Sequence, residues 1–393
     1  MLFERQIFKK IKGEIETKEI TVITGMRRVG KTTTLRYLYD LVESENKVFL
    51  DLENPINRKV FEEENYDSVW SNLKQFGITD SQKAYIFLDE AQNLPELSLV
   101  AKYLYDHFEV KFVLTGSSSY YLKNLFPESL AGRKIVFELY PLNFAEFLVF
   151  KNVKRVEKDT LREKAANKNK ISFASLDPYY QEYLGFGGFP SVVLEENSDR
   201  KGVLLSEIFT SYFEKDAKSL ADFRDMSKLR DLILLLAPRV AARIEIQKLA
   251  SELSLSRETV YNYLSFLEDT YFISLLPRYT ASIDRQAAGS KKLFFCDLGI
   301  VNVLGKVSQG QIFEQSVFQN LRGFYDIAYF SKDGTNEIDF VLDGVYALEA
   351  KLSYSPRDSR VLKQRSYGLK VSESYIVTNH FTERSGAILA IDL

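Results

Sequence analysis

The chain has 393 residues, of which 45% are hydrophobic and 27% are charged, as is typical of a globular protein with material for more than one core. Its 52 Lys and Arg nearly balance its 54 Asp and Glu, and the net charge of −2 excludes an indiscriminate polyanion binder, so any nucleic-acid contact must be a local patch. One cysteine, a charged N-terminal segment and no apolar run of membrane-spanning length predict a soluble cytoplasmic protein without disulfides or membrane contact.

Residues 19–41, EITVITGMRRVGKTTTLRYLYDL, predict a strand, a glycine-containing loop and a helix in succession. The loop has the pattern GxxxxGKT, in which glycines let backbone N–H groups surround phosphate oxygens at a helix N-terminus. In this pattern Lys31 reaches the β- and γ-phosphates, and the Thr32 hydroxyl coordinates Mg²⁺. We therefore predict ATP and Mg²⁺ as ligands, although the chemistry assigns no separate role to the two arginines. The nucleotide-binding residues are Gly25, Met26, Arg27, Arg28, Val29, Gly30, Lys31, Thr32 and Thr33.

Two further apolar runs end in residues suited to ATP hydrolysis. KAYIFLDEAQN, residues 83–93, places Asp89 beside the Mg²⁺ and Glu90 where it can polarise an attacking water. VKFVLTGSSSYY, residues 110–121, ends in hydroxyl side chains that can hold the γ-phosphate or the water. Either Thr115 or Ser117 fits that role, and the sequence leaves both open.

These motifs, together with SLAGRKIVFELYPLNFAEFL at 129–148, resemble AAA-type P-loop ATPases of a widespread archaeal and bacterial family. The resemblance implies an α/β fold, with a parallel sheet, helices on both faces and residues 112–118 as the central strand. Residues 48–54 and 133–142 would supply the remaining strands. It also makes Arg133 a candidate arginine finger or γ-phosphate sensor, acting in trans if the protein forms a homo-oligomer; the alternative is a surface arginine before a strand.

Residues 151–170 carry eight Lys or Arg against three Asp or Glu, which favours a solvated helix or linker over a nucleic-acid strip. The glycine-rich turn GGFP follows at 187–190. It resembles the Gly-x-Pro turn of signal-transduction ATPases related to AAA proteins, which implies that Pro190 contacts adenine. From its chemistry alone, the double glycine predicts a turn.

Residues 244–279 predict a helix, a short turn, a second helix and a strand, the order of a winged helix. Ser256 is suited to cap the second helix, whose buried side carries Val260, Leu264 and Leu267. The exposed side has one arginine against two glutamates, and these acids would repel the phosphates of DNA. The pattern therefore favours an intramolecular or protein contact over DNA reading. The residues predicted to be exposed are Arg257, Glu258, Tyr261, Asn262 and Glu268.

The remaining chain, from about residue 292, predicts a helix followed by three strands, a further helix and a last strand, and it resembles restriction-endonuclease-like folds. The resemblance assigns an acid on the first helix, an Asp on the second strand and Glu-x-Lys on the third. Asp339 and Glu349 would then hold Mg²⁺ or Mn²⁺, and Lys351 would position the attacking water. The full set is Glu314, Asp339, Glu349 and Lys351.

The turn in this hairpin decides whether the acids meet. A two-residue turn at Asp343 and Gly344 puts Asp339 beside Leu348, on the wrong face. A three-residue loop, Leu342-Asp343-Gly344, puts Asp339 diagonal to Glu349 on one face, at roughly 7–8 Å. Glu314 shares a helical face with apolar residues, so it should require a metal or a cation partner.

Two functional hypotheses follow. In the first, an ATPase is coupled to a metal-dependent nuclease acting on nucleic acid, preferably DNA. In the second, an ATP-driven switch or scaffold carries a nuclease-like tail that binds without catalysis. A third, a transcription regulator, is weakened by the acidic second helix. The predicted domains are a P-loop core at 1–150, a basic linker and helical lid at 151–215, a winged helix at 216–288 and a nuclease-like domain at 289–393.

Overall fold

The computed structural model describes residues 2–116, 132–217, 226–280, 289–332, 336–369 and 371–393. They form two compact units, one of residues 1–140 with 269–271, the other of residues 141–268 with 272–393. The first unit thus ends at Tyr140, before the expected limit of 150, and the helix over 144–150 belongs to the second unit. The expected linker, winged-helix and nuclease-like segments lie in this second unit, except for residues 269–271 of the winged-helix segment, and their division into domains stays a prediction.

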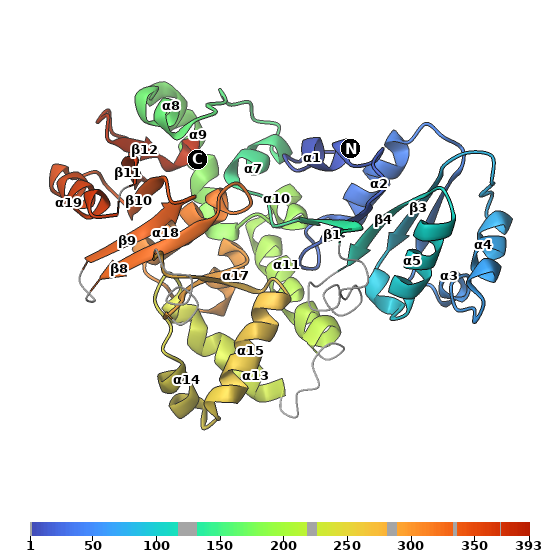
Figure 1. Ribbon diagram of the computed structural model, residues 1–393. Coiled ribbons are helices and arrows are strands. Elements are labelled where there is room, and N and C mark those ends of the chain that lie inside the picture. The colour runs from blue at the N-terminus through green and yellow to red at the C-terminus, as the bar shows by residue number, and fades with distance from the viewer. Residues whose placement is uncertain (1, 117–131, 218–225, 281–288, 333–335, 370) are drawn as a thin grey trace. The chain divides into compact units, whose positions relative to one another are not determined.

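The first unit is built on a five-stranded parallel sheet in the order β2-β3-β4-β1-β5 (Figure 1). The predicted central strand is confirmed, because β4 lies between the strand that enters the phosphate loop, β1, and the strand that ends in Asp89, β3. Strands β1, β3 and β4 are buried along their whole length, as expected for a parallel sheet covered on both faces. The strands are β1 Ile20–Thr24, β2 Lys47–Asp51, β3 Ala84–Asp89, β4 Val110–Gly116 and β5 Lys134–Glu138.

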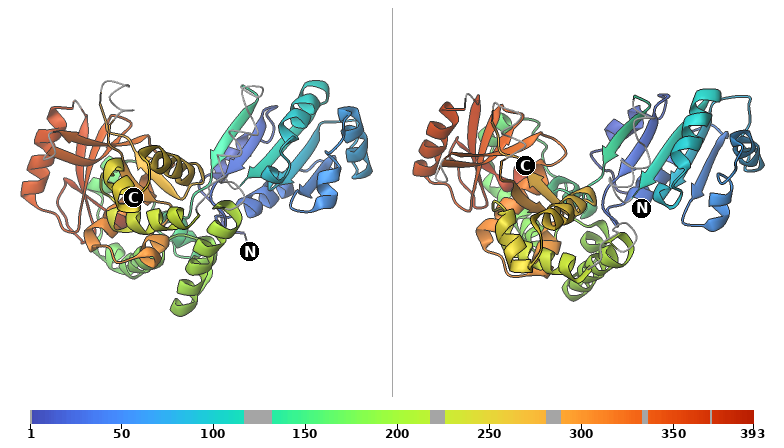
Figure 2. Two further views of the ribbon diagram at one scale, coloured as in Figure 1. Left: turned by 90° about the horizontal axis from the view of Figure 1, so that it is seen from below. Right: turned by 60° about the horizontal axis from the view of Figure 1, so that its bottom comes forward.

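Helices cover both faces of this sheet, which can be followed in the two views of Figure 2. On one face, Trp70 of α4 and Leu104 of α5 join the strand residues in a single apolar core. On the other face, α2 packs its Tyr39 ring edge-on against Phe87 of β3, at 5.4 Å between ring centroids. The helices of this unit are α1 Phe8–Gly13, α2 Lys31–Leu41, α3 Pro55–Lys59, α4 Tyr66–Gln75 and α5 Leu97–His107.

The second unit begins with helices and a short antiparallel pair of strands, β6 Ile273–Leu276 and β7 Lys292–Phe295. The strands follow helices α14 and α15 in the predicted order, and Val260, Leu264 and Leu267 are buried as expected. The α-helices that precede the strands are α7 Phe144–Phe150, α8 Leu161–Ala166, α9 Lys170–Phe186, α10 Pro190–Leu194, α11 Ser198–Ser211, α13 Met226–Leu236, α14 Ile246–Leu253 and α15 Arg257–Asp269. Whether this segment is a winged helix in function stays a prediction.

A second five-stranded sheet, in the order β12-β11-β10-β9-β8, completes this unit. Its first three strands in the chain are antiparallel, and β11 and β12 then join in parallel. The predicted succession of helix, three strands, helix and strand is therefore present. The elements are α17 Leu298–Leu304, α18 Gln309–Leu321, β8 Ile327–Lys332, β9 Asn336–Leu342, β10 Tyr346–Lys351, α19 Pro356–Tyr367, β11 Glu373–Thr378 and β12 Ala387–Leu389.

The GGFP turn is held inside the second unit by a buried carboxylate. Asp297 is fully buried, and its carboxylate accepts hydrogen bonds from the backbone N–H groups of Gly188 at 2.7 Å and Gly299 at 2.8 Å. Gly187 has φ +73°, and a Cβ there would lie 1.9 Å from the Asp297 carboxylate. This close approach explains Gly187 without a nucleotide. An adenine contact by Pro190, the first residue of α10, stays a prediction.

Gly187→Ala is expected to lower the free energy of unfolding by about 3 kcal/mol, because the methyl group overlaps the Asp297 carboxylate and the backbone conformation is strained for alanine. Urea unfolding of the full chain measures the loss. Gly202→Ala is the control, since Gly202 lies in α11 and a Cβ there has no neighbour within 4 Å. The control should be neutral or slightly stabilising. Equal losses of unfolding free energy in both variants would contradict the role of the Asp297 carboxylate in holding this turn.

In the part of the chain that the structure describes, none of the helices combines the length and the apolar character needed to cross a membrane.

Candidate functional sites

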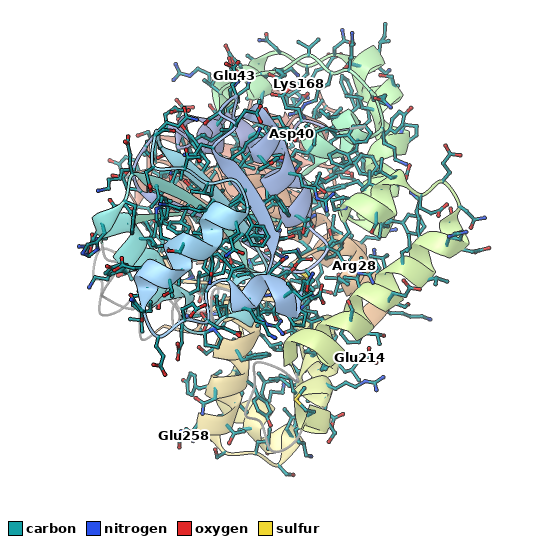
Figure 3. The ribbon with its side chains drawn as sticks, turned by 90° about the vertical axis from the view of Figure 1, so that its right-hand side faces the viewer. Arg28, Asp40, Glu43, Lys168, Glu214 and Glu258 are labelled. Atoms are coloured by element: carbon teal, nitrogen blue, oxygen red, sulfur yellow. The ribbon has the colours of Figure 1, made fainter. Side chains whose placement is uncertain are left out.

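The phosphate loop connects β1 to α2 at the carboxyl edge of the first sheet. Gly25 has φ +148°, and a Cβ on it would come within 2.1 Å of the carbonyl oxygen of Leu139, the residue after β5, so only glycine fits there. Gly30 has φ +102° and directly precedes α2, which begins at Lys31. Arg28 has φ +64° and is exposed on the loop (Figure 3). The predicted strand–loop–helix arrangement is confirmed, and it places the loop and the N-terminus of α2 together at the carboxyl end of β1.

Two basic side chains hold the shape of this loop. Lys31 is buried, and its ammonium donates hydrogen bonds to the carbonyl oxygens of Gly25 at 2.9 Å and Met26 at 3.0 Å. Arg5, which the sequence analysis missed, donates to the carbonyl oxygens of Val29 at 3.1 Å and Tyr140 at 2.8 Å. An isolated arginine in a charged N-terminal segment gives no signal of such a role. To bind phosphate, Lys31 must exchange the loop carbonyls for phosphate oxygens.

Asp89 lies at the end of β3, with its carboxylate buried among hydroxyl groups. The Thr115 hydroxyl donates a hydrogen bond to this carboxylate and accepts one from the Glu90 N–H at 3.1 Å. Burial raises the pKa of the Asp89 carboxyl, and the hydroxyls of Thr115 and Thr32 act in the opposite direction by hydrogen bonding to it. A carboxylate and a hydroxyl from the phosphate loop fit Mg²⁺, which typically takes one or two protein carboxylates together with phosphate oxygens and water.

Glu90 follows Asp89 in the left-handed region, with φ +55°, and its side chain is half-buried. Its carboxylate accepts a hydrogen bond from the Gln92 side-chain amide. Gln92 is a second residue that the sequence analysis did not assign, although it lies within the quoted DEAQN motif. Glu90 must leave this amide, or share it, to polarise a water molecule.

Of the two alternative hydroxyl residues, Thr115 lies at the site, whereas Ser117 falls outside the described residues. Arg133 does not reach the phosphate loop of its own chain. Its carbonyl oxygen pairs with the N–H of Ile20 at the amino end of β1, and the loop lies at the other end of that strand, roughly 16 Å away. This geometry argues against Arg133 as a γ-phosphate sensor within its own chain, because the short strand β1 holds Arg133 and the phosphate loop at opposite edges of the sheet. An arginine finger in trans stays a prediction.

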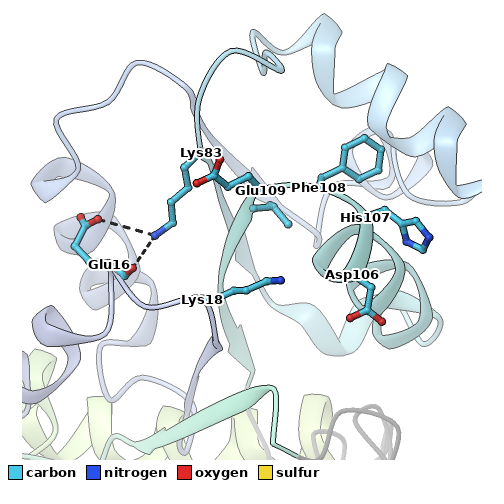
Figure 4. A pocket seen from close by; sticks show the side chains of 8 residues that line it. Glu16, Lys18, Lys83, Asp106, His107, Phe108 and Glu109 are labelled. Atoms are coloured by element: carbon cyan, nitrogen blue, oxygen red, sulfur yellow. Dashed lines mark hydrogen bonds and ion pairs between the residues drawn. The ribbon is translucent and has the colours of Figure 1, made fainter.

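The surroundings of Arg133 suit an ion pair. Its guanidinium lies 3.3 Å from the Asp106 carboxylate, beside a surface pocket of about 410 Å³ (Figure 4). Acidic and basic side chains alternate around this pocket, and Lys83 donates to the carbonyl oxygen of Glu16 at 2.9 Å. The pocket lies at the amino edge of the sheet, away from the phosphate loop, and is lined by Glu16, Lys18, Lys83, Asp106, His107, Phe108, Glu109 and Val110.

In the second unit, the β9–β10 turn brings the two predicted acids onto one face. Leu342 pairs with Tyr346 and Phe340 with Leu348, and extending this register puts Asp339 directly opposite Glu349. The loop has three residues, as the shared face requires, but they are 343–345, one position later than expected. Asp343 explains the shift, because its N–H donates to the Asp326 carbonyl oxygen at 2.9 Å and its carboxylate accepts from the Asp326 N–H at 2.8 Å.

A buried lysine occupies the centre of the acidic cluster. The ammonium of Lys292, with its side chain 1% exposed, lies 2.5 Å from Glu314, 2.9 Å from Glu337 and 3.2 Å from Asp339. Burial acts to lower the pKa of Lys292, but the three carboxylates outweigh it and raise that pKa. The expected cation partner of Glu314 is thus confirmed as a lysine. A lysine opening the apolar run KLFFC was the available signal, and the sequence analysis did not use it.

Glu349 has basic partners of its own. Its carboxylate lies 2.9 Å from the Lys351 ammonium and 3.9 Å from the Arg365 guanidinium of α19, while its second oxygen is buried without a hydrogen-bond partner. Asp339 is also engaged, since it accepts from the Ala350 N–H at 2.9 Å as well as from Lys292. Glu314 and Asp339 therefore converge on the Lys292 ammonium, whereas the Glu349 carboxylate contacts Lys351 and Arg365 instead.

These side chains do not fit the predicted divalent ion. Among the described residues, no three His, Cys, Asp or Glu side chains are arranged to hold a metal. The metal-ligand assignment of Glu314, Asp339 and Glu349 is corrected accordingly. The physical reason is the ammonium of Lys292, which already supplies a positive charge to the carboxylates that an ion would need.

Raising the pH from about 6 to about 9 is expected to destabilise the second unit. Burial and the charge of Asp339 raise the pKa of Glu314 to about 8 and that of Glu349 to about 7. The folded state therefore binds more protons than the unfolded state between the ordinary value of 4.5 and these values, and stability falls as pH rises through that window. Thermal unfolding of wild type and Glu314→Gln measures the effect. An equally steep fall in the variant would contradict a contribution from Glu314.

The predicted second helix of the winged-helix segment is α15. Ser256 accepts a hydrogen bond from the Thr259 N–H at 3.0 Å, which confirms the cap. The exposed residues include Arg257, Tyr261, Asn262 and Glu258, the last of which lies at the outer surface of the helix (Figure 3). Glu268 is half-buried rather than exposed, because its carboxylate accepts from the Leu275 N–H of β6 at 3.1 Å.

Two segments of the chain match known protein families, and most of the chain matches individual relatives. Residues 17–148 match the AAA domain family, and residues 177–311 match a domain of unknown function (DUF8612). The uncharacterized protein MJ1544 of Methanocaldococcus jannaschii is 32% identical over 355 residues, covering 86% of this chain and 76% of that protein. An uncharacterized protein of Haemophilus influenzae is 28% identical over 340 residues, covering 83% of this chain and 80% of that protein. The matched AAA segment contains the whole phosphate loop and both hydrolysis motifs.

Two of the solved structures that match this chain do so at a low level of similarity. The Aeropyrum pernix ORC1 protein, solved in complex with DNA, aligns with 77% of this chain and 92% of its own, at 12% identity and a TM-score of 0.33. A signal transduction ATPase with numerous domains from Pyrococcus horikoshii aligns with 94% of this chain and 48% of its own, at 12% identity and a TM-score of 0.29. No conclusion about function is drawn from either.

Proposed function

Because the chain belongs to the family of the Methanocaldococcus jannaschii protein MJ1544 and carries an AAA domain of the P-loop ATPase type, we propose that it binds and hydrolyses ATP with Mg²⁺. We further propose that the nucleotide state switches a nuclease-like C-terminal module that binds its partner without cleaving it. The observation that carries the first proposal is the Asp89 carboxylate, held between Thr32 of the phosphate loop and Thr115 of β4.

Each residue of the first site has a defined task in this proposal. The loop N–H groups and the Lys31 ammonium bind the phosphates and stabilise the negative charge that develops during transfer. Thr32, with Asp89 beside it, would hold Mg²⁺, which supplies positive charge to the β- and γ-phosphates. Glu90 orients the attacking water, and Thr115 fixes the backbone of Glu90 through its N–H. Gln92 holds the Glu90 carboxylate back until the water is in place.

Phosphate release from Mg·ATP tests this proposal. Wild type should hydrolyse ATP, and Lys31→Ala should reduce the rate at least about 100-fold, as expected for loss of one charged phosphate ligand. Lys9→Ala is the control, because Lys9 is an exposed residue of α1 that the mechanism does not use. Hydrolysis that survives in Lys31→Ala, or is absent in wild type, would contradict the proposal.

The proposal that the tail does not cleave rests on Lys292, whose ammonium lies within 3.2 Å of the carboxylates of Glu314, Glu337 and Asp339. A metal-dependent nuclease is the competing proposal. A cleavage assay distinguishes the two proposals. It incubates single- and double-stranded DNA and RNA with Mg²⁺ or Mn²⁺ and compares wild type with Glu349→Ala. We expect no products that depend on Glu349. Products that disappear in Glu349→Ala would establish the nuclease and overturn the binding module.

A further inference from the structure

One face of α19 carries a row of exposed cations. Arg357, Arg360 and Lys363 are exposed, as are Gln364 and Tyr367, the last with 89% of its surface accessible. Their spacing of three and four residues places them on one side of the helix. Leu362 and Ser366 are buried on the opposite side, where α19 packs against the C-terminal sheet. The row therefore faces away from the core.

These three cations lie in a row, and no acid neutralises them. Within the described chain, the charged groups of Arg357, Arg360 and Lys363 have no ion-pair or hydrogen-bond partner. In the basic segment 151–170, by contrast, Lys151 pairs with Glu182 at 2.8 Å and Lys158 with Asp392 at 2.8 Å. In a chain of net charge −2, an unneutralised row of three cations is a local positive patch suited to a polyanion.

A pocket of about 290 Å³ lies beside this row, between α19 and the β8–β9 strands. An aromatic ring, Phe330, and two amide side chains, Asn336 and Gln364, line it together with Lys332 and Arg365. Gln364 belongs to both the pocket and the exposed face of α19. Amides can hydrogen-bond the edge of a nucleobase, an aromatic ring can contact its face, and the cations can hold the adjoining phosphate.

From the row and the pocket together, we propose that α19 binds single-stranded nucleic acid, with phosphates along Arg357, Arg360 and Lys363 and one unstacked base in the adjacent pocket. Tyr367, exposed at the end of the row, stacks on a further base. A duplex would satisfy the cations but could not place a base in the pocket, because its bases are paired and stacked. The inference names the partner of the tail and rests on the proposed function only in treating the tail as a binding module.

The binding of labelled oligonucleotides of about 20 nucleotides, followed by fluorescence anisotropy, tests the proposal on the full chain. This length exceeds the ~4–16 nucleotides that one OB-fold domain covers. The variant Arg357→Glu/Arg360→Glu/Lys363→Glu should weaken single-strand binding at least 100-fold. The slope of log K against log salt should become shallower by about 2, since roughly 0.7 counterion is released per phosphate contact. Tyr367→Ala should weaken single-strand binding about tenfold and change duplex binding little.

A second triple variant, Lys170→Glu/Lys248→Glu/Lys306→Glu, makes the same change in net charge at exposed positions outside α19. It should bind like wild type. Equal losses in both triple variants, tighter binding of duplex than of single strand, or no nucleic-acid binding by wild type would each overturn the proposal. Lys31→Ala, tested without nucleotide, should bind like wild type. A failure of α19 binding is therefore distinct from a failure of ATP hydrolysis.

Discussion

Glu90→Gln is expected to reduce ATP hydrolysis about 1000-fold while leaving ATP binding intact, because the amide cannot polarise the attacking water but keeps the shape of the side chain. The phosphate ligands lie elsewhere, in the loop that ends at Lys31 and Thr32. Single-turnover phosphate release measures the chemical step, and binding of a fluorescent ATP analogue measures affinity.

Glu62→Gln is the matched control for this change, since Glu62 is an exposed acid of the same unit and lies outside the site. It should hydrolyse ATP at the wild-type rate. A Glu90→Gln variant that retains hydrolysis would remove Glu90 from the mechanism. A variant that loses binding together with hydrolysis would assign Glu90 to the structure of the loop instead.

Lys292→Met is expected to lower the free energy of unfolding by about 3–5 kcal/mol, because it leaves buried carboxylates without their cation. Three acids, Glu314, Glu337 and Asp339, lie within 3.2 Å of the ammonium. The adjacent Lys291→Met is the control. Lys291 has a side chain 39% exposed and lies 3.8 Å from Glu268, so its removal should cost less than about 1 kcal/mol.

Urea unfolding compares the two variants, and direct titration with Mn²⁺ adds a second readout. The carboxylates freed in Lys292→Met should bind Mn²⁺ more tightly than wild type does, with ATP absent in both titrations. Equal stability of the two methionine variants would contradict the central role of Lys292. Tight Mn²⁺ binding to the tail of wild type, unchanged in Lys292→Met, would restore the metal site.

The phosphate loop could be predicted from sequence because its chemistry is local. Gly25, Gly30 and Lys31 lie within one turn and the start of one helix, so their spacing alone fixes their geometry. The Asp89 strand and the β4 strand followed from apolar runs that end in polar residues, and the resemblance to AAA-type ATPases implied the central position of β4. Arg5 escaped prediction because its contacts, Val29 and Tyr140, depend on tertiary packing that no local pattern encodes.

The acidic cluster around Lys292 could be predicted only in part. Alternation along the strands left two alternatives, of which the three-residue loop put Asp339 and Glu349 on one face. The position of that loop depended on the contact between Asp343 and Asp326. Lys292 is 47 residues before Asp339 in the chain, and only the packing of β7 against the sheet brings them together. The sequence could therefore predict that Glu314 needs a metal or a cation partner, whereas the choice of Lys292 as that partner depends on tertiary packing.

The most direct test of the account is calorimetric titration of Mg·ATP into the full-length wild type and Lys31→Ala. Wild type should bind one nucleotide per chain, and the variant should bind it at least about 100-fold more weakly. Wild type that binds no nucleotide, or a Lys31→Ala variant that binds as tightly as wild type, would contradict the assignment of the Gly25–Thr32 loop as the phosphate-binding site.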